Sequence, residues 1–265
     1  MQFAIGPDGS KIEAARGRKG RCPVCGEPCS PKCGTVRVHH WAHIAGVECD
    51  PWWEPETDWH RSWKALFDPE VVEVPMGPHR ADIATERVVV ELQNSAISEE
   101  EIAAREAFYG SMIWIVNAAS FADRFFLTRL MGDNVFAFRW KQIKPTWLRA
   151  RRTIYLDFGF TTVADLRGAR FRSTSHSFGQ EGEERSYDRR TVVRYRGSSE
   201  VLTGHSAYKP DESLRDLTPW QLSRTMLRLQ TLYRNGSGSA APVDRETIFR
   251  RHGLSAVLRA KEPEP

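Results

Sequence analysis

The chain has 265 residues, of which 40% are hydrophobic and 27% are charged. These values exclude wholesale disorder and allow one large domain or two small ones. The net charge of +4 is mild. Most of its basic residues are arginines, whose planar groups suit phosphate, so the balance is compatible with nucleic acid without demonstrating it. We see no secretion signal and no apolar run approaching about 18 residues, so we expect a cytoplasmic protein without membrane association.

Composition divides the chain into three regions. Residues 1–50 are rich in Gly, Pro, Cys and His, which predicts a small metal-binding module. Residues 51–160 alternate helix-like and strand-like segments, and we expect them to form the main domain. We interpret residues 161–265 as a C-terminal extension that is partly flexible. Within it, a Thr-Pro start and spaced apolar residues predict a helix over 218–234, and the Gly/Ser-rich run 235–242 is typical of a linker.

The cysteines and histidines of the first region have the spacing of a zinc site. Cys22 and Cys25 form a CxxC pair, and His40 and His43 form an HxxH pair about 14 residues later. Two such pairs supply a closed tetrahedral shell, which favours structural over catalytic zinc. We expect these four residues to be the ligands, with Cys33 as an alternative ligand.

Other thiols keep a second arrangement open. Cys29, His39 and Cys49 lie near the two pairs. An all-cysteine site made of Cys22, Cys25, Cys29 and Cys33 is also possible, although its tight spacing would strain a single site. The other interpretation, a reduced protein with unligated thiols, explains one CxxC pair well but not five cysteines within 28 residues.

The second region contains a predicted hairpin with acids near both strand ends. Segment 79–84 reads HRADIA and segment 88–93 reads VVVELQ, with only a short polar link between them. Pairing across this link brings Asp82 close to Glu91, and two neighbouring carboxylates repel unless a cation lies between them. Hard oxygen ligands of this kind suit magnesium. The simpler alternative is a strand that leaves the core for solvent.

Helical segments flank this hairpin. At helical spacing Glu56, His60, Trp63 and Phe67 share a stripe, and Lys64 borders it. The polar residues of this stripe face a cleft, or else the segment is an ordinary amphipathic helix on the surface. Ser98 begins a second helix with a capping box, and Gly110 ends it. Segment 112–116 has the composition of a buried strand.

The order of these elements resembles the PD-(D/E)XK nuclease core. More narrowly, residues 1–160 resemble the CoiA-like competence family. The resemblance is carried by CPVC at 22–25, HWAH at 40–43, ETDWHRSWK at 56–64, HRADI at 79–83 and VELQNSAIS at 90–98, with Arg105 and Tyr109 before WIV at 114–116. It implies an α/β (α+β), restriction-endonuclease-like fold, with a mixed sheet flanked by helices behind a zinc module. Residues after about 165 match no family that we can name.

The resemblance also implies site roles. Asp82 and Glu91, with the carbonyl of Leu92, would hold catalytic Mg²⁺ or Mn²⁺, and Glu56 would complete the site. Gln93 stands where the superfamily has lysine, which lowers the expectation of fast catalysis because an amide carries no charge. Lys64 and Arg105 are candidate substitute cations, and His60 is a candidate for contacting phosphate or placing water.

Further residues are candidates for nucleic-acid contacts. They are Arg105 and Tyr109 on the second helix, together with Lys144, Arg149, Arg151 and Arg152 in a basic segment around Trp147. The alternative for this basic segment is a helix with a solvated basic side, in which Trp147 is core.

Two functions follow as expectations. The first is a metal-dependent deoxyribonuclease that acts in DNA uptake, processing or recombination, with DNA and recombination proteins as partners. The second is a nuclease-fold binding protein that holds DNA without cutting it.

Overall fold

The computed structural model describes residues 1–44, 49–130, 135–143, 145–159, 171–173, 191–194 and 225–259. The chain divides into two compact units, one formed by Met1–Ile115 with Phe249–Pro265 and the other by Val116–Ile248. Among the described residues no helix combines the length and apolar character needed to span a bilayer.

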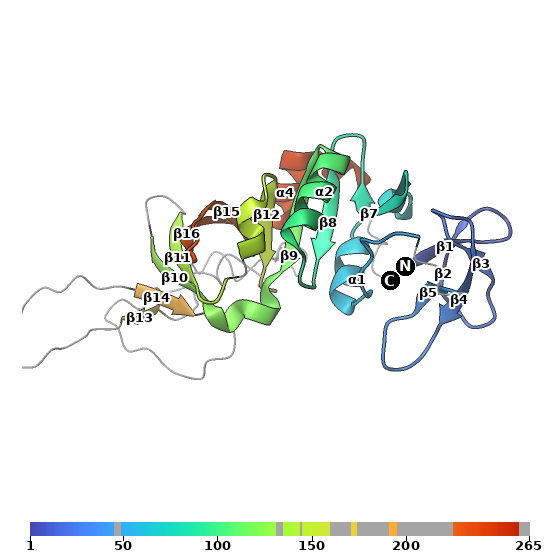
Figure 1. Ribbon diagram of the computed structural model, residues 1–265, viewed down its shortest axis with the longest axis horizontal. Helices are drawn as coiled ribbons and strands as arrows, with labels where there is room; N and C mark the ends of the chain where they lie inside the picture. Colours follow the sequence, from blue (N-terminus) through green and yellow to red (C-terminus); the bar gives the residue numbers. More distant parts are fainter. Residues whose placement is uncertain are drawn as a thin grey trace, which may run out of the picture. The chain divides into compact units, whose positions relative to one another are not determined.

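The first unit begins with a small antiparallel sheet. Its strands follow the order β2 (Lys11–Glu13), β1 (Phe3–Ile5), β3 (Gly20–Arg21), β4 (Pro28–Lys32) and β5 (His40–His43) (Figure 1). Its core is correspondingly small and consists of Ala4, Ala14, Cys22, Cys29 and Trp41. A core of this size in a segment rich in Gly and Pro is typical of modules that depend on metal for stability.

The same unit contains a second sheet that carries the candidate site. Its strands here follow the order β9 (Met112–Asn117), β8 (Val89–Gln93), β7 (His79–Ala84) and β6 (Val72–Met76), and a 3₁₀ turn at Pro69–Val71 precedes β6. β7 pairs antiparallel with both β6 and β8. All five residues of β8 are buried, which fits its run of valines. The predicted hairpin is confirmed.

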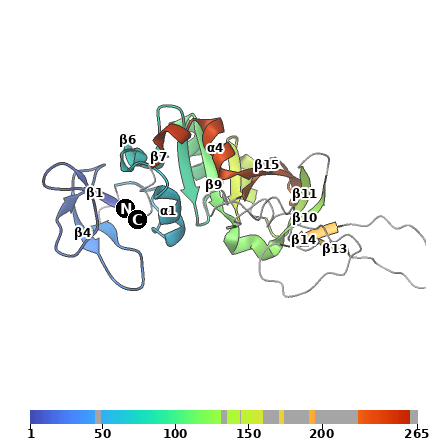
Figure 2. The same cartoon turned by 180° about the vertical axis from the view of Figure 1, so that it is seen from behind.

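The first helix is shorter than its apolar stripe predicts. α1 (Asp58–Lys64) starts after Thr57, whose hydroxyl accepts the His60 backbone N–H while the His60 ring accepts the Thr57 N–H. Glu56 therefore precedes the helix and is not a member of its stripe. The buried face of α1 consists of His60, Trp63 and Lys64, and both views show α1 between the small sheet and the strands of the second sheet (Figure 2).

The second helix matches its prediction. α2 (Glu99–Tyr109) starts after Ser98, whose hydroxyl accepts the Glu101 N–H at 3.0 Å. It ends at Gly110, which has a φ of 67° and so occupies the left-handed region that glycine enters without strain.

The C-terminal segment contributes to the first unit. Phe249 of α4 (Arg245–His252) packs edge-on against Trp63 and Phe67. The Asp68 N–H donates to Val257 O at 2.9 Å, and a short 3₁₀ turn at Ser255–Val257 follows α4. The C-terminal segment therefore covers the end of α1, a contact for which the sequence gives no signal.

The second unit is mainly β. It contains a 3₁₀ segment (Ala118–Arg124), a 3₁₀ turn (Pro145–Arg149) and strands in the order β13 (Phe171–Ser173), β14 (Thr191–Arg194), β10 (Phe125–Leu130), β11 (Phe136–Trp140), β16 (Ser237–Asp244), β15 (Thr225–Leu232) and β12 (Thr153–Asp157). Its described core includes Phe125, Phe138, Tyr155 and Phe158. Helices and sheets together make the chain a mixed α+β protein, as expected.

The predicted helix over 218–234 is wrong where the structure describes it. Thr225–Leu232 is a strand that pairs antiparallel with Ser237–Asp244, and residues 218–224 lie outside the described residues. The run 235–242, which we expected to be a linker, forms the turn and most of the second strand of this hairpin. Asn235-Gly236 is a strong hairpin signal because Gly236, with a φ of 77°, enters the left-handed region freely. Its Gly/Ser-rich neighbours concealed this signal.

Candidate functional site

Four side chains of the N-terminal module form a cluster suited to metal. The ligand atoms of Cys22, Cys25, His43 and Cys49 all lie within 4.8 Å of one another. The sulfurs of Cys22 and Cys49 are 3.6 Å apart, and Cys25 Sγ is 3.3 Å from His43 Nε2. Zinc–thiolate bonds of about 2.3 Å give a tetrahedral edge of about 3.7 Å, so these residues fit a structural zinc ion.

The prediction of His40 as a ligand is wrong, and Cys49 is the fourth residue of the cluster. An HxxH pair puts both imidazoles on one side only in a short helix or turn, but His40–His43 is a strand. Residues three apart on a strand point to opposite faces. The His40 ring instead bonds Val38 O through Nδ1 at 2.9 Å. Cys33, the alternative ligand, packs against the small core without joining the cluster.

The acid–base properties of the cluster fit a cation site. Burial and the neighbouring Cys22 thiol raise the pKa of Cys49 to about 12, so the Cys49 thiolate forms only beside a compensating cation. Burial lowers the pKa of His43, and nearby Arg80 lowers it further. The ring is therefore neutral at pH 7, which is its ligand form.

Variants of Cys49 and His40 distinguish the two ligand sets. We expect Cys49→Ser to reduce bound zinc well below one ion per purified chain, because the shell loses one of three thiolates. His40→Ala should retain about one ion. Elemental analysis of both variants measures the difference. Zinc lost from His40→Ala and retained in Cys49→Ser would contradict this assignment.

Three carboxylates lie on neighbouring strands of the second sheet. The register pairs Val72 with Ile83 and Val74 with Ala81, which sets Glu73 across from Asp82. β7 and β8 pair Ile83 with Val90, and continuing that register sets Asp82 across from Glu91. Glu73, Asp82 and Glu91 therefore form a carboxylate row on β6, β7 and β8. A buried row of this kind is stable only with cations beside it.

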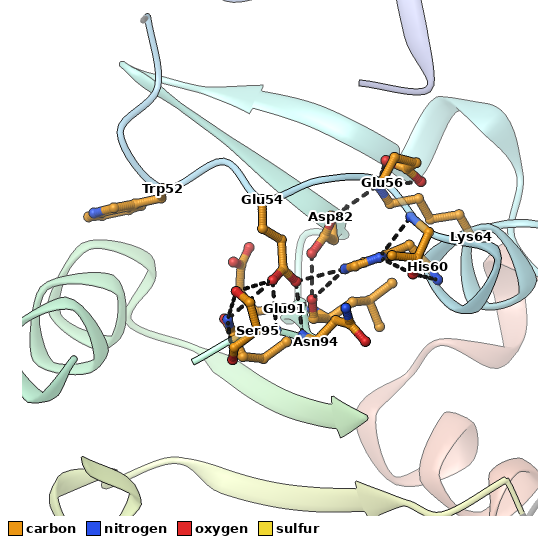
Figure 3. Close-up of polar contacts among 12 residues, drawn as sticks. Trp52, Glu54, Glu56, His60, Lys64, Asp82, Glu91, Asn94 and Ser95 are labelled. Atoms are coloured by element: carbon orange, nitrogen blue, oxygen red, sulfur yellow. Dashed lines mark hydrogen bonds and ion pairs between the residues drawn. The ribbon is translucent and has the colours of Figure 1, made fainter. Parts of the chain in front are cut away.

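Lys64 is the cation on one side of this row. Its Nζ lies 3.0 Å from Asp82 Oδ1 and 3.1 Å from Glu56 Oε2 (Figure 3). It also lies 3.1 Å from Glu73 Oε1, and only 3% of the residue is exposed. Burial alone would lower the pKa of Lys64, but the three carboxylates raise it, so the amine stays charged. Burial would also raise the pKa of Asp82, but Lys64 and His60 hold it below its ordinary value.

Glu91 has a different environment from Asp82. Arg105 Nη1 contacts Glu91 Oε2 at 2.5 Å, whereas Glu91 Oε1 is buried and has no hydrogen-bond partner among the described residues. Burial, aided by the charge of Asp82, raises the pKa of Glu91 to about 7 despite Arg105. An ionised Asp82 beside a Glu91 with one unbonded oxygen is an arrangement that a divalent cation would complete.

His60 connects α1 to the end of β8. Its Nε2 lies 3.1 Å from the carbonyl oxygen of Leu92 and 2.7 Å from Glu54 Oε1. The Leu92 N–H in turn donates to Asp82 Oδ2 at 3.0 Å. Burial alone would lower the pKa of His60, but Glu54 and Asp82 raise it above its ordinary value. His60 thus orients the carbonyl predicted as the third metal contact.

Gln93 belongs to a separate hydrogen-bonded group at the end of β8. Its amide nitrogen donates to the Ser95 carbonyl at 3.2 Å and lies 3.4 Å from Glu54 Oε2. Glu54 also accepts the backbone N–H groups of Asn94 and Ser95, both at 2.9 Å. In this arrangement Gln93 supports Glu54, and the cation beside Asp82 is Lys64.

Glu73 joins the row to the N-terminal strand. Its carboxylate accepts the N–H groups of Gln2 at 2.8 Å and Phe3 at 2.9 Å as well as the contact from Lys64. The φ of Glu73 is 50°, a left-handed conformation that is unfavourable for glutamate by about 1–3 kcal/mol. These contacts offset that cost and hold the small sheet against the second sheet.

The protonation of Glu91 predicts a pH-dependent effect on stability. Its folded-state pKa of about 7 exceeds the ordinary 4.5, so Glu91 destabilises the fold progressively as pH rises from about 4.5 to 7. Glu91→Gln keeps the oxygen that Arg105 contacts and cannot ionise. We expect it to raise the free energy of unfolding by up to about 3 kcal/mol at pH 8 and by little at pH 5. Urea unfolding without divalent cations measures both values, and equal effects at both pH values would contradict the account.

The predicted nucleic-acid contacts separate into two groups. Arg105 and Tyr109 are buried on α2, where Arg105 bonds Glu91, Glu101 and the Trp52 carbonyl, so neither side chain is open to solvent. In the second unit Arg149, Arg151 and Arg152 are exposed, and the last two lie beside a hollow of about 290 Å³. Trp147 is buried, as the core alternative predicts, and Lys144 lies outside the described residues.

Comparison with known proteins identifies one segment. Residues 8–51 match the family model of the N-terminal domain of competence protein CoiA. This confirms the resemblance to CoiA-like proteins over a segment that contains all four cluster residues. No curated protein and no solved structure matches the chain.

Proposed function

We propose that this chain, which carries a CoiA N-terminal domain at residues 8–51, is a metal-dependent nuclease with a PD-(D/E)XK core that hydrolyses phosphodiester bonds of DNA. The observation that supports this most is the unequal pair formed by Asp82 and Glu91. One carboxylate is held ionised by Lys64, and the other presents an unbonded, buried oxygen next to it. The CoiA match supports a role in DNA uptake, processing or recombination, with DNA and recombination proteins as partners.

In this proposal the chain supplies oxygen ligands and fixed charges. Asp82, Glu91 and the Leu92 carbonyl would hold Mg²⁺ or Mn²⁺, whose hard charge suits such ligands. Bound there, the ion supplies the charge that polarises a phosphate and acidifies water. Lys64 orients Asp82 and provides the positive charge that Gln93 lacks. His60 holds the Leu92 carbonyl, and Glu56 acts on the site through Lys64.

A cleavage assay tests the proposal. Single-stranded, duplex and branched DNA are incubated with Mn²⁺ and the wild type or Asp82→Ala/Glu91→Ala. We expect cutting by the wild type that chelator and the double variant both abolish. Equal cutting by the two proteins would show that the activity does not depend on these carboxylates and would refute the proposed site.

One observation favours a second candidate, a nuclease-fold protein that binds DNA without cutting it. Lys64 and Arg105 already neutralise much of the charge of Asp82 and Glu91, and Gln93 replaces the usual lysine. Absence of cutting by both proteins, together with metal-independent DNA binding that survives Glu91→Ala, would select this alternative.

A further inference from the structure

A groove of about 320 Å³ lies within the first unit, and its lining includes Glu56, the partner of Lys64. One wall comes from the small sheet and the loop before β5, and the other from the segment that leads into α1. Its lining includes Arg37, His40 and Trp41 on the first wall and Trp53, Glu54 and Glu56 on the second. Asp50 and two residues of the metal cluster, His43 and Cys49, also line it. This volume is at the small end of ligand sites, about 300–1,000 Å³, and takes one nucleotide-sized group rather than a duplex.

The acids of the groove are already engaged by other groups. Glu54 accepts hydrogen bonds from Ser95 and Asn94 and contacts His60. Asp50 accepts the Arg80 N–H at 3.0 Å and contacts His79. Glu56 pairs with Lys64, as described above. Lys64 and His60 offset part of the negative charge of Glu56 and Glu54, which weakens the repulsion of a phosphate by the groove.

Two groups of the groove remain open to a ligand. Arg37 is exposed and makes no polar contact with any other described residue. Trp53 is 55% exposed, although large aromatic side chains usually bury most of their surface. An accessible aromatic ring on one wall of a groove and an unpaired guanidinium on the other can together stack a base and bind its phosphate.

We propose that this groove binds one nucleotide of a single-stranded nucleic acid, with its base on Trp53 and a phosphate on Arg37. Glu56 lines the groove and accepts a hydrogen bond from Lys64, which also contacts Asp82, so ion pairs connect the groove to the carboxylate row. The inference deepens the proposed function and rests on it only for the role of this strand as substrate.

Binding without cutting tests the groove separately from catalysis. Fluorescence anisotropy is measured with labelled oligo(dT), oligo(U) and a duplex, on the full chain with Asp82→Asn/Glu91→Gln as background. In this background we expect Trp53→Ala and Arg37→Ala each to weaken oligo(dT) binding by about 10-fold. Arg37→Ala should also reduce the slope of log affinity against log salt by about 0.7. Matched controls are Tyr233→Ala, which removes another exposed aromatic ring, and Arg16→Ala, which removes another exposed arginine.

The outcomes separate the two proposals. Weakening by both groove variants but by neither control supports the groove, and the comparison of oligo(dT) with oligo(U) identifies its sugar preference. Unchanged binding in both groove variants, no binding at all, loss in Arg37→Ala alone, or duplex binding as tight as single-strand binding overturns it. Groove-dependent binding by a wild type that never cuts DNA would leave the groove standing and refute only the nuclease proposal.

Discussion

Replacing Lys64 by methionine should lower the free energy of unfolding by about 3–5 kcal/mol. The amine is buried among Glu56, Glu73 and Asp82, and methionine would leave these carboxylates without their shared cation. The pKa values of Glu73 and Asp82, which Lys64 holds down, would rise, so the loss should be larger at pH 8 than at pH 5. Urea unfolding of purified protein at both pH values measures the change.

Two comparisons identify the cause of this loss. Arg61→Met, one turn earlier on α1, removes a more exposed cation with contacts of 3.5 Å to Glu13 and Glu56, and should cost less than about 1 kcal/mol. Adding Glu73→Gln to Lys64→Met should restore part of the stability, because it removes one uncompensated charge. A Lys64→Met protein as stable as the wild type at pH 8 would contradict the buried-cation account.

Replacing Asp82 by asparagine should reduce DNA cleavage by about 10³-fold or more. An amide is nearly the same size but brings no negative charge to the metal, whose stabilisation of the transition state is worth several kcal/mol. The fold should persist because Lys64 keeps two other carboxylate partners. Rates at saturating Mn²⁺ measure the loss, and the unfolding midpoint checks the fold.

A matched variant tests whether the effect belongs to the site. Glu106 is a buried carboxylate on α2 that accepts the Trp114 ring N–H at 3.0 Å, away from the row. Glu106→Gln should leave the cleavage rate within about 3-fold of wild type. Equal losses in both variants would indicate a general dependence on packing and would remove Asp82 from the site.

Elements with strong local signals were predictable from the sequence. Ser98 and Gly110 define both ends of α2 by capping rules. The β7–β8 hairpin follows from two apolar runs and a short polar link, and its register brings Asp82 to Glu91. Lys64 was also a candidate, since it borders the buried stripe of α1.

Residues that act over long sequence distances were not predictable in this way. Glu54 holds backbone groups about 40 residues later, and Glu73 holds those of Gln2 and Phe3 some 70 residues earlier. The sequence signal for Glu73 was a single charged residue within an apolar strand. The signal for Glu54 was weaker, since only its position before Pro55 distinguished it. Cys49 was not among the expected ligands because the HxxH spacing pointed to His40, but residues 40–43 are a strand, on which His40 and His43 face opposite sides.

Manganese binding is the most direct measurement of the central claim, that Asp82 and Glu91 form a divalent-metal centre. Calorimetric titration of zinc-loaded protein with Mn²⁺ at pH 8 compares the wild type with Asp82→Asn/Glu91→Gln. We predict about one Mn²⁺ per wild-type chain and none in the double variant, with zinc content unchanged in both. Equal manganese binding by the two proteins, or none by the wild type, would contradict the account.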